Sequence, residues 1–195
     1  DKGFTGLEFS SGVPGTIGGG IYMNAGAKYG CYGDILKEVR LFDFAHGFRQ
    51  WKREELHFAY RESQVRNSIV IWATFELRRG DSESIRNEVN RIIQERAEKQ
   101  PLDYPSCGST FKNGPDYSSG RLIEKAGLKG LTVGGAEIST KHANFILNKG
   151  NATAKDILTL INIIKERVKE QFGISLECEV CVLGGDLEGT QSKKT

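Results

Sequence analysis

The residues of this sequence that could do chemistry begin with a glycine-rich segment, Ser11–Ala27, which holds six glycines and one proline. Glycine reaches positive φ without steric cost, so successive backbone N–H groups can converge on an anion. A helix that starts in this segment would add its own unpaired N–H groups. The segment lacks the Lys-Ser/Thr ending of a P-loop and the strand-GxGxxG order of a Rossmann turn. The pattern therefore predicts a site for a diphosphate-bearing cofactor, with a tight structural loop as the alternative.

Three further side chains could take part in catalysis, although residue type alone does not assign a role to any of them. Arg61 carries a permanent charge on a planar fork, which suits a carboxylate that gains charge, although a surface charge is the simpler interpretation. Ser109 has a hydroxyl, a weak acid that needs positioned partners to donate a proton. No Ser-His-Asp constellation indicates that it is an acyl nucleophile. Glu179, near the end of an expected strand, has a carboxylate whose pKa would decide its role.

The four cysteines, Cys31, Cys107, Cys178 and Cys181, are too few for a secreted disulfide scaffold. The spacing of Cys178 and Cys181 fits half of a zinc site, but the other two cysteines do not form a second pair. The segment around them alternates like a strand, which places residues three apart on opposite faces. We therefore interpret all four as incidental thiols and expect no metal site.

Composition describes an ordinary soluble globular protein. The 195 residues are 38% apolar and 27% charged, with a formal net charge of +2. This charge is too small to argue for nucleic acid or an anionic membrane as a partner. No apolar run approaches the ~20 residues of a membrane span, and no secretory signal begins the chain. We expect a cytoplasmic protein with a small-molecule substrate, acting as a monomer.

Periodicity and turn residues predict an α+β fold rather than a doubly wound sheet. Helices are expected from Ser82, as the N-cap, to Lys99, from Gly120 to Ala126, and from the Thr153 cap to Phe172. Strands are expected over the following ranges: Leu36–Phe44, Ser68–Leu77, Leu131–Val133, Ala143–Leu147 and Ile174–Leu183. A domain boundary is expected near Gly80.

Four separated segments together resemble one family, the flavoenzyme UDP-N-acetylenolpyruvoylglucosamine reductases of bacterial cell-wall synthesis. They are Ser11–Ala27, Phe58–Ser63 (FAYRES), Pro105–Asn113 (PSCGSTFKN) and Leu176–Val180 (LECEV). Further similar stretches lie between the last two, at Leu122–Gly130, Gly134–Ala136 and Lys141–Ile146. The resemblance covers nearly the whole chain in the family's order.

The resemblance implies a two-part FAD-binding domain and an α+β substrate-binding domain. Residues 1–79 would be the second part of the flavin domain, with the first part missing upstream, and residues 80–173 the substrate domain. Residues 174–184 would form a closing strand that returns to the active site, and residues 185–195 a flexible tail. The compact substrate domain resembles the shorter subtype of the family.

The resemblance also implies a reaction and its residues. NADPH would reduce FAD, which would pass hydride to the enolpyruvyl ether of UDP-N-acetylglucosamine. Arg61 would stabilise charge on the substrate, Ser109 would donate a proton and Glu179 would polarise the site, with Glu177 as the rival carboxylate. Substrate would contact Tyr60, Lys112 and Asn113. The cofactor would contact Ser11, Gly12, Pro14, Gly15, Thr16, Gly18, Gly19, Asn24 and Ala25.

The sequence departs from the family at a few positions. Cys178 and Cys181 stand where proline and arginine are common, and Gly114 stands where proline is usual, so the segments around Glu179 and Ser109 are expected to be less rigid. Two other functions remain open. One is another FAD-dependent oxidoreductase of the same flavin-domain class, acting on an alcohol or lactone. The other is an inactive nucleotide-sugar-binding fragment.

Overall fold

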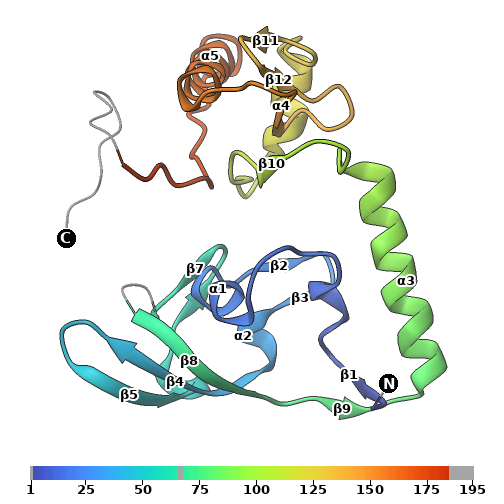
Figure 1. Cartoon of the computed structure of the whole chain (residues 1–195), viewed down its shortest axis with the longest axis vertical. Coiled ribbons are helices and arrows are strands. Elements are labelled where there is room, and N and C mark those ends of the chain that lie inside the picture. Colours follow the sequence, from blue (N-terminus) through green and yellow to red (C-terminus); the bar gives the residue numbers. More distant parts are fainter. Residues whose placement is uncertain (1, 66–67, 185–195) are drawn as a thin grey trace. The chain divides into compact units, whose positions relative to one another are not determined.

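The computed structural model describes residues 2–65 and 68–184, so the expected tail at 185–195 lies outside the described residues. The chain divides into two compact units, Asp1–Lys99 and Gln100–Thr195 (Figure 1). The division falls after the long helix α3 (Ser82–Lys99), not before it at Gly80. The assignment of the two parts to flavin and substrate stays a prediction.

The first unit is built on a three-stranded antiparallel sheet in the order β5-β4-β8. Its strands are β4 (Leu36–Asp43), β5 (Gly47–Lys52) and β8 (Ser68–Phe75), which confirms the two strands predicted here. Val39 and Leu41 of β4 are fully buried and pack with Ile21 of the short helix α1. The alternating apolar residues of β4 therefore attach α1, which lies within the glycine-rich segment, to the sheet.

Small elements complete this unit. They are β1 (Phe4–Thr5), η1 (Glu8–Ser10), α1 (Ile17–Tyr22), β2 (Gly26–Ala27), β3 (Gly30–Cys31), α2 (Tyr32–Ile35), η2 (Arg53–Glu55), β6 (Phe58–Ala59), β7 (Glu62–Ser63) and β9 (Arg78–Arg79). Two-residue strands pair as β1-β9, β2-β3 and β6-β7. The β2-β3 hairpin begins at the end of the glycine-rich segment, and the β6-β7 hairpin carries the expected Tyr60 and Arg61.

The N-cap of α3 is Asp81, so the prediction of Ser82 as the cap was wrong. The Asp81 carboxylate accepts a hydrogen bond from the amide of Ser84 at 2.7 Å, and this bond lowers the pKa of Asp81. Aspartate and serine cap equally well, and the sequence offers both in adjacent positions.

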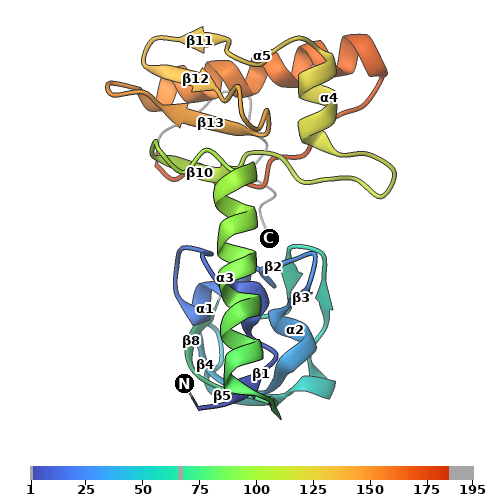
Figure 2. The same cartoon turned by 90° about the vertical axis from the view of Figure 1, so that its right-hand side faces the viewer.

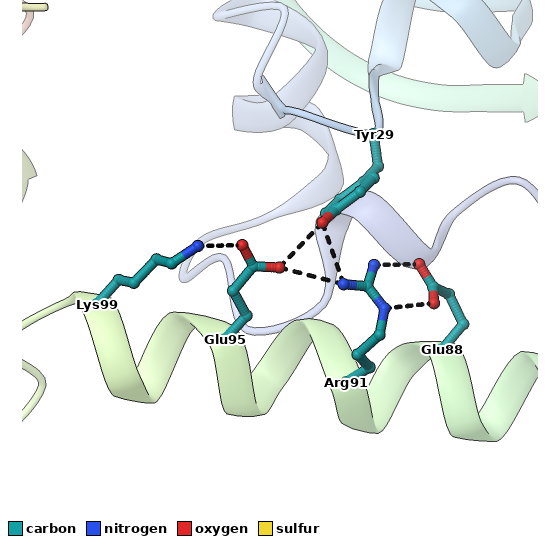
Figure 3. Close-up of polar contacts among 5 residues, drawn as sticks. All are labelled: Tyr29, Glu88, Arg91, Glu95 and Lys99. Carbon is teal, nitrogen blue, oxygen red and sulfur yellow. Dashed lines mark hydrogen bonds and ion pairs between the residues drawn. The ribbon is translucent and has the colours of Figure 1, made fainter.

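A polar network attaches α3 to the β2-β3 hairpin (Figure 3). The Tyr29 hydroxyl donates to Glu95 at 2.9 Å and accepts from Arg91 at 3.1 Å. Arg91 binds Glu88 through two hydrogen bonds of 2.6 and 2.7 Å, and Lys99 pairs with Glu95. Helix α3 also contacts η1 and β1 and buries Ile92, so it belongs to the first unit.

The second unit has a four-stranded antiparallel sheet in the order β10-β13-β12-β11. Its strands are β10 (Ser106–Ser109), β11 (Thr132–Val133), β12 (Ala136–Ile138) and β13 (Phe145–Asn148). Helix α5 (Ala154–Phe172) packs against β11 and β12, and α4 (Ser119–Lys125) contacts α5 (Figure 2). Both helices were predicted, and the mixture of antiparallel sheets with separate helices confirms the α+β class.

Helix α5 follows its sequence pattern closely. Thr153 accepts from the amide of Asp156 while Asp156 accepts from that of Thr153, which is the predicted capping box. The helix ends at Gly173, whose φ of +72° only glycine adopts at low cost. The buried face consists of Leu160, Ile161, Ile164 and Val168. No described helix combines the length and the hydrophobicity needed to cross a membrane.

The predicted strand Ile174–Leu183 was wrong. Within it only Cys178 forms a β-bridge, with Phe111, and the flanking residues join no strand. Among the described residues, only two backbone hydrogen bonds join it to the facing segment: the carbonyl of Thr110 accepts one and the amide of Lys112 donates the other, so the ladder is too short to be a strand. Alternation of apolar residues requires only one buried face, which an extended segment also has.

Candidate active site

The glycine-rich segment forms an exposed turn that leads into α1. Gly12 and Gly15 have φ of +71° and +123°, so both depend on the absence of a side chain. Thr16 is the N-cap of α1 and accepts from the amide of Gly19 at 3.1 Å. The first amides of a helix have no acceptor within it, which leaves those of Ile17 and Gly18 for another partner. The cofactor contacts expected along this segment stay predictions.

Arg96 of α3 lies against this turn, and no motif of the sequence indicated it. A Cβ built on Gly12 would lie 3.4 Å from both Cδ and Nε of Arg96. Burial lowers the pKa of Arg96, although the guanidinium stays charged. In the described part of the chain no hydrogen bond or ion pair of Arg96 is recorded. A half-buried cation beside exposed amides is suited to an anionic group.

Tyr60 and Arg61 form the two-residue turn between β6 and β7. Arg61 has φ of +55°, a left-handed conformation that costs a non-glycine residue about 1–2 kcal/mol. Its guanidinium carbon lies 5.0 Å from the ring centre of Tyr60, which is 53% exposed. Backbone strain of this kind concentrates at functional sites, so the turn is a candidate on structural grounds too.

Asn24 connects this hairpin to the glycine-rich segment. Asn24 is 6% exposed, and its Nδ2 donates to the carbonyl of Ala59 at 2.8 Å. Oδ1 accepts from the amide of Gly33 at 2.9 Å, and Ser63 donates to the carbonyl of Tyr22 at 2.6 Å. Asn24 was predicted to bind cofactor, and its side-chain groups instead make these internal bonds. A cofactor contact of its backbone stays a prediction.

Ser109 follows a bulge in strand β10. Ser106 pairs with Leu147 and Ser109 with Phe145, so three steps along β10 match two along β13. Gly108, with φ of +77°, provides the bulge conformation. Bulges change the direction of the following side chain, and they are common beside active sites. Half-buried Ser109 is therefore placed by this local irregularity.

Glu179 is brought next to this segment by backbone pairing. The amide of Glu179 donates to the carbonyl of Thr110 at 2.9 Å, and the amide of Lys112 donates to the carbonyl of Glu177 at 2.9 Å. Together with the Phe111–Cys178 bridge, these bonds align the two segments. Ser109 is thus one residue from the partner of Glu179. The structure thus pairs the segment that follows Ser109 with the segment that carries Glu179, although the two lie far apart in the sequence.

The two neighbouring glutamates differ in their surroundings. Glu177 has a side chain 71% exposed and forms an ion pair with Nζ of Lys112 at 2.6 Å. Glu179 is half-buried and also takes part in an interaction besides its backbone bond to Thr110. The predicted preference for Glu179 over Glu177 is consistent with this difference, since Glu177 is already paired with a lysine at the surface.

The predicted substrate residues Lys112 and Asn113 lie just before α4. The Asn113 side chain accepts from the amide of Ser119 at 3.0 Å, and the Ser119 hydroxyl donates to the carbonyl of Lys112. Ser119 is fully buried, so these bonds fix the loop to the start of α4. Tyr60 and Arg61 belong to the first unit, and Ser109, Lys112, Asn113 and Glu179 to the second.

A pocket of about 770 Å³ in the first unit contains none of the predicted site residues. It lies beside α3 and η1, and five carboxylates line it: Glu8, Asp34, Glu76, Asp81 and Glu88. Acidic walls do not suit a phosphate-bearing ligand. The cavity therefore adds nothing to the predicted site.

Comparison with known proteins agrees with these motifs. Residues 100–183 match the family model of the UDP-N-acetylenolpyruvoylglucosamine reductase C-terminal domain. The chain is 46% identical over 184 residues to the UDP-N-acetylenolpyruvoylglucosamine reductase of Pediococcus pentosaceus, covering 93% of this chain and 61% of that one. It is 48% identical over 182 residues to that of Caldanaerobacter subterraneus subsp. tengcongensis, covering 92% and 60%.

A solved structure gives the same result. The crystal structure of UDP-N-acetylenolpyruvylglucosamine reductase from Thermus caldophilus superposes with a TM-score of 0.79 at 39% sequence identity. The match covers 90% of this chain and 63% of that one. The chain thus spans about 60% of the length of the relatives that it matches.

Proposed function

This chain belongs to the UDP-N-acetylenolpyruvoylglucosamine reductase family, and on that basis we propose that the protein reduces UDP-N-acetylglucosamine enolpyruvate to UDP-N-acetylmuramate. NADPH is the reductant, and the reaction supplies cytoplasmic peptidoglycan synthesis. The observation that carries the proposal is the pairing of residues 110–112 with 177–179. Ser109 directly precedes Thr110, whose carbonyl accepts from the amide of Glu179, and this supports Ser109 as the proton donor and Glu179 as the carboxylate of the same site.

FAD is the proposed cofactor, and it supplies hydride transfer from NADPH to the vinyl carbon of the enol ether. The surroundings of the glycine-rich turn fit its diphosphate. Gly12 and Gly15 expose backbone, the first amides of α1 lack partners within the helix, and Arg96 adds a charge beside Gly12. The proposed contacts are those predicted along Ser11–Gly19, the backbone of Asn24, and Ala25, joined by Arg96.

The side chains divide the remaining chemistry. Arg61 stabilises the negative charge that develops on the substrate carboxylate, because a guanidinium keeps its proton and binds both oxygens. Ser109 donates a proton to the carbon between the carboxylate and the ether oxygen. Glu179 polarises the site close to Ser109, and Tyr60, Lys112 and Asn113 bind the UDP-sugar.

Titration of the purified protein with FAD tests the cofactor assignment. Bound flavin should give the protein a yellow colour that NADPH bleaches. Arg96→Ala should weaken FAD binding about tenfold, because a hydrogen bond to a charged group contributes about 1.5–3 kcal/mol. Arg49→Ala removes an exposed arginine of β5 and is the matched control. A protein that binds no FAD would contradict the proposed function, and equal affinity in both variants would remove Arg96 from the site.

A further inference from the structure

Asn144 is a buried asparagine whose side chain and backbone carbonyl both bind the two residues that follow Ser109. It lies directly before β13 and is 3% exposed. Its Oδ1 accepts from the amide of Phe111 at 3.0 Å, and its Nδ2 donates to the carbonyl of Phe111 at 2.8 Å. Its own carbonyl accepts from the amide of Thr110 at 2.8 Å. The site predicted from the sequence did not include Asn144.

The hydrogen bonds of Asn144 take the place of backbone pairing just beyond the point where the pairing of β10 with β13 ends. The ladder between β10 and β13 stops at Ser109 and Phe145. Phe111 is 1% exposed, so its amide and carbonyl would be buried without partners if they were not bound. The carboxamide of Asn144 offers one acceptor and one donor in the arrangement of a peptide group. It therefore continues the sheet by one residue through a side chain.

Phe111 is also the residue through which the Glu179 segment is attached. Phe111 forms the bridge with Cys178, and the two backbone bonds on either side involve Thr110 and Lys112. Asn144 therefore binds one edge of residues 110–112, while residues 177–179 bind the other. A displacement of Phe111 would move Ser109 and Glu179 relative to each other.

Asn144 is itself held in place by His142. Nδ1 of His142 accepts from the amide of Asn144 at 3.2 Å, and the imidazole packs edge-on against Phe145 with 5.0 Å between ring centres. Burial lowers the pKa of His142, so the ring is neutral and can accept at neutral pH. This agrees with the interpretation of His142 as a packed, hydrogen-bonded histidine.

We propose that Asn144 is a positioning residue that aligns Ser109 with Glu179 for proton transfer to the substrate. The inference rests on the proposed function. Asn144 acts through the backbone of Thr110 and Phe111 and touches no reacting atom. Its effect should appear in the step that uses Ser109 and be absent from reduction of the flavin by NADPH.

Asn144→Asp separates these effects with a small change. The carboxylate keeps an acceptor for the amide of Phe111 but faces the carbonyl of Phe111 with an oxygen instead of a donor. Asn148→Asp is the matched control, because it makes the same substitution in β13. The Asn148 Oδ1 accepts from Gly150 and Ala152, bonds that aspartate can retain. Asn144→Ser is a second variant with a short hydroxyl.

The experiment follows the flavin-loaded enzyme by rapid mixing. With Asn144→Asp we expect an unchanged rate of flavin reduction by NADPH and a rate of reoxidation by the enolpyruvyl UDP-sugar that is about 10- to 100-fold lower, as a misplaced catalytic group produces. The solvent deuterium isotope effect on reoxidation should rise, since proton transfer becomes slower. Asn148→Asp should match the wild type in both rates.

The other possible results would overturn either the role of Asn144 or the proposed function itself. Wild-type reoxidation in a folded Asn144→Asp enzyme, or an equal loss in both half-reactions, would overturn the role of Asn144. If both Asn144 variants fail to fold while Asn148→Asp folds, Asn144 is structural and the inference is also overturned. If the wild-type enzyme itself is not reoxidised by the enolpyruvyl UDP-sugar, the proposed function fails.

Discussion

Asn24 donates a 2.8 Å hydrogen bond to the carbonyl of Ala59, and so joins the end of α1 to the hairpin that carries Arg61. Asn24 is buried, and the same side chain accepts from the amide of Gly33. The second unit has an equivalent arrangement, in which Asn144 binds the backbone of Phe111. Each unit thus uses one buried asparagine to hold a segment with a predicted catalytic residue.

Asn24→Asp should lower the free energy of unfolding by about 1–3 kcal/mol, because the carbonyl of Ala59 would lose its buried donor. Chemical denaturation of the wild type and the variant measures the difference. Asn87→Asp makes the same substitution on the exposed face of α3, and it should change stability by less than about 0.5 kcal/mol. Equal effects at the two positions would show that the bond to Ala59 contributes nothing.

Arg61→Gly should separate stability from activity. Glycine adopts the φ of +55° found at Arg61 without strain, so the variant should be more stable by up to about 1 kcal/mol. Reoxidation of reduced flavin by substrate should nevertheless be nearly lost, because the charge is removed. Arg61→Lys keeps both the strain and the charge, and it should be no more stable than the wild type. A stable Arg61→Gly enzyme with full activity would contradict the role of Arg61.

Glu179→Gln should slow substrate-driven reoxidation much more than Glu177→Gln. Glu179 is half-buried and its amide binds Thr110 beside Ser109, whereas Glu177 is exposed and paired with Lys112. Ser109→Ala should show the same pattern as Glu179→Gln, with flavin reduction by NADPH preserved. The half-reactions are measured separately by flavin absorbance. A greater loss in Glu177→Gln would mean that the carboxylates were assigned in the wrong order.

The Tyr29 network predicts a pH dependence of the α3 attachment. Hydrogen bonds from Lys99 and then Tyr29 lower the pKa of Glu95 from an ordinary 4.5 to about 2. A depressed carboxyl pKa contributes stability above the unfolded value, and that contribution is lost as pH falls from about 4.5 towards 2. Because these groups are exposed, the contribution should be small and should decrease with added salt.

Tyr29→Phe should raise the pKa of Glu95, since the hydroxyl donor is removed while Lys99 remains. Carboxyl carbon NMR of Glu95 across this pH range measures the shift. Tyr104→Phe, in the second unit, should leave the titration of Glu95 unchanged. The same pKa of Glu95 in both variants would remove Tyr29 as a cause.

The sequence predicts best where local pattern decides structure. The stripe of α5 and its Thr153 cap arise from residues close together in the chain, and so does the alternation of β4. The segment after α5 shows the limit, because an alternating pattern does not reveal how much of a partner strand is available. Competing caps, such as Asp81 and Ser82, show the same limit, because the two residues cap equally well and only the folded chain shows that Asp81 binds the amide of Ser84.

The candidate site divides in the same way. Ser109, Arg61 and Glu179 were predicted through motifs, whereas the bond between Glu179 and Thr110, the residue after Ser109, is seen only in the folded chain. Asn144 binds a residue 33 positions away and Asn24 one 35 positions away, distances at which no periodicity operates. A signal for Asn144 existed, since a polar residue within the apolar stretch Ala143–Leu147 is buried only with partners.

The most direct test of the account is the reaction of the NADPH-reduced, flavin-loaded protein with UDP-N-acetylglucosamine enolpyruvate in the absence of oxygen. We predict that flavin absorbance returns with one equivalent of substrate, and that UDP-N-acetylmuramate is formed in equal amount. A flavin that stays reduced when the enolpyruvyl UDP-sugar is present in excess would contradict the proposed function.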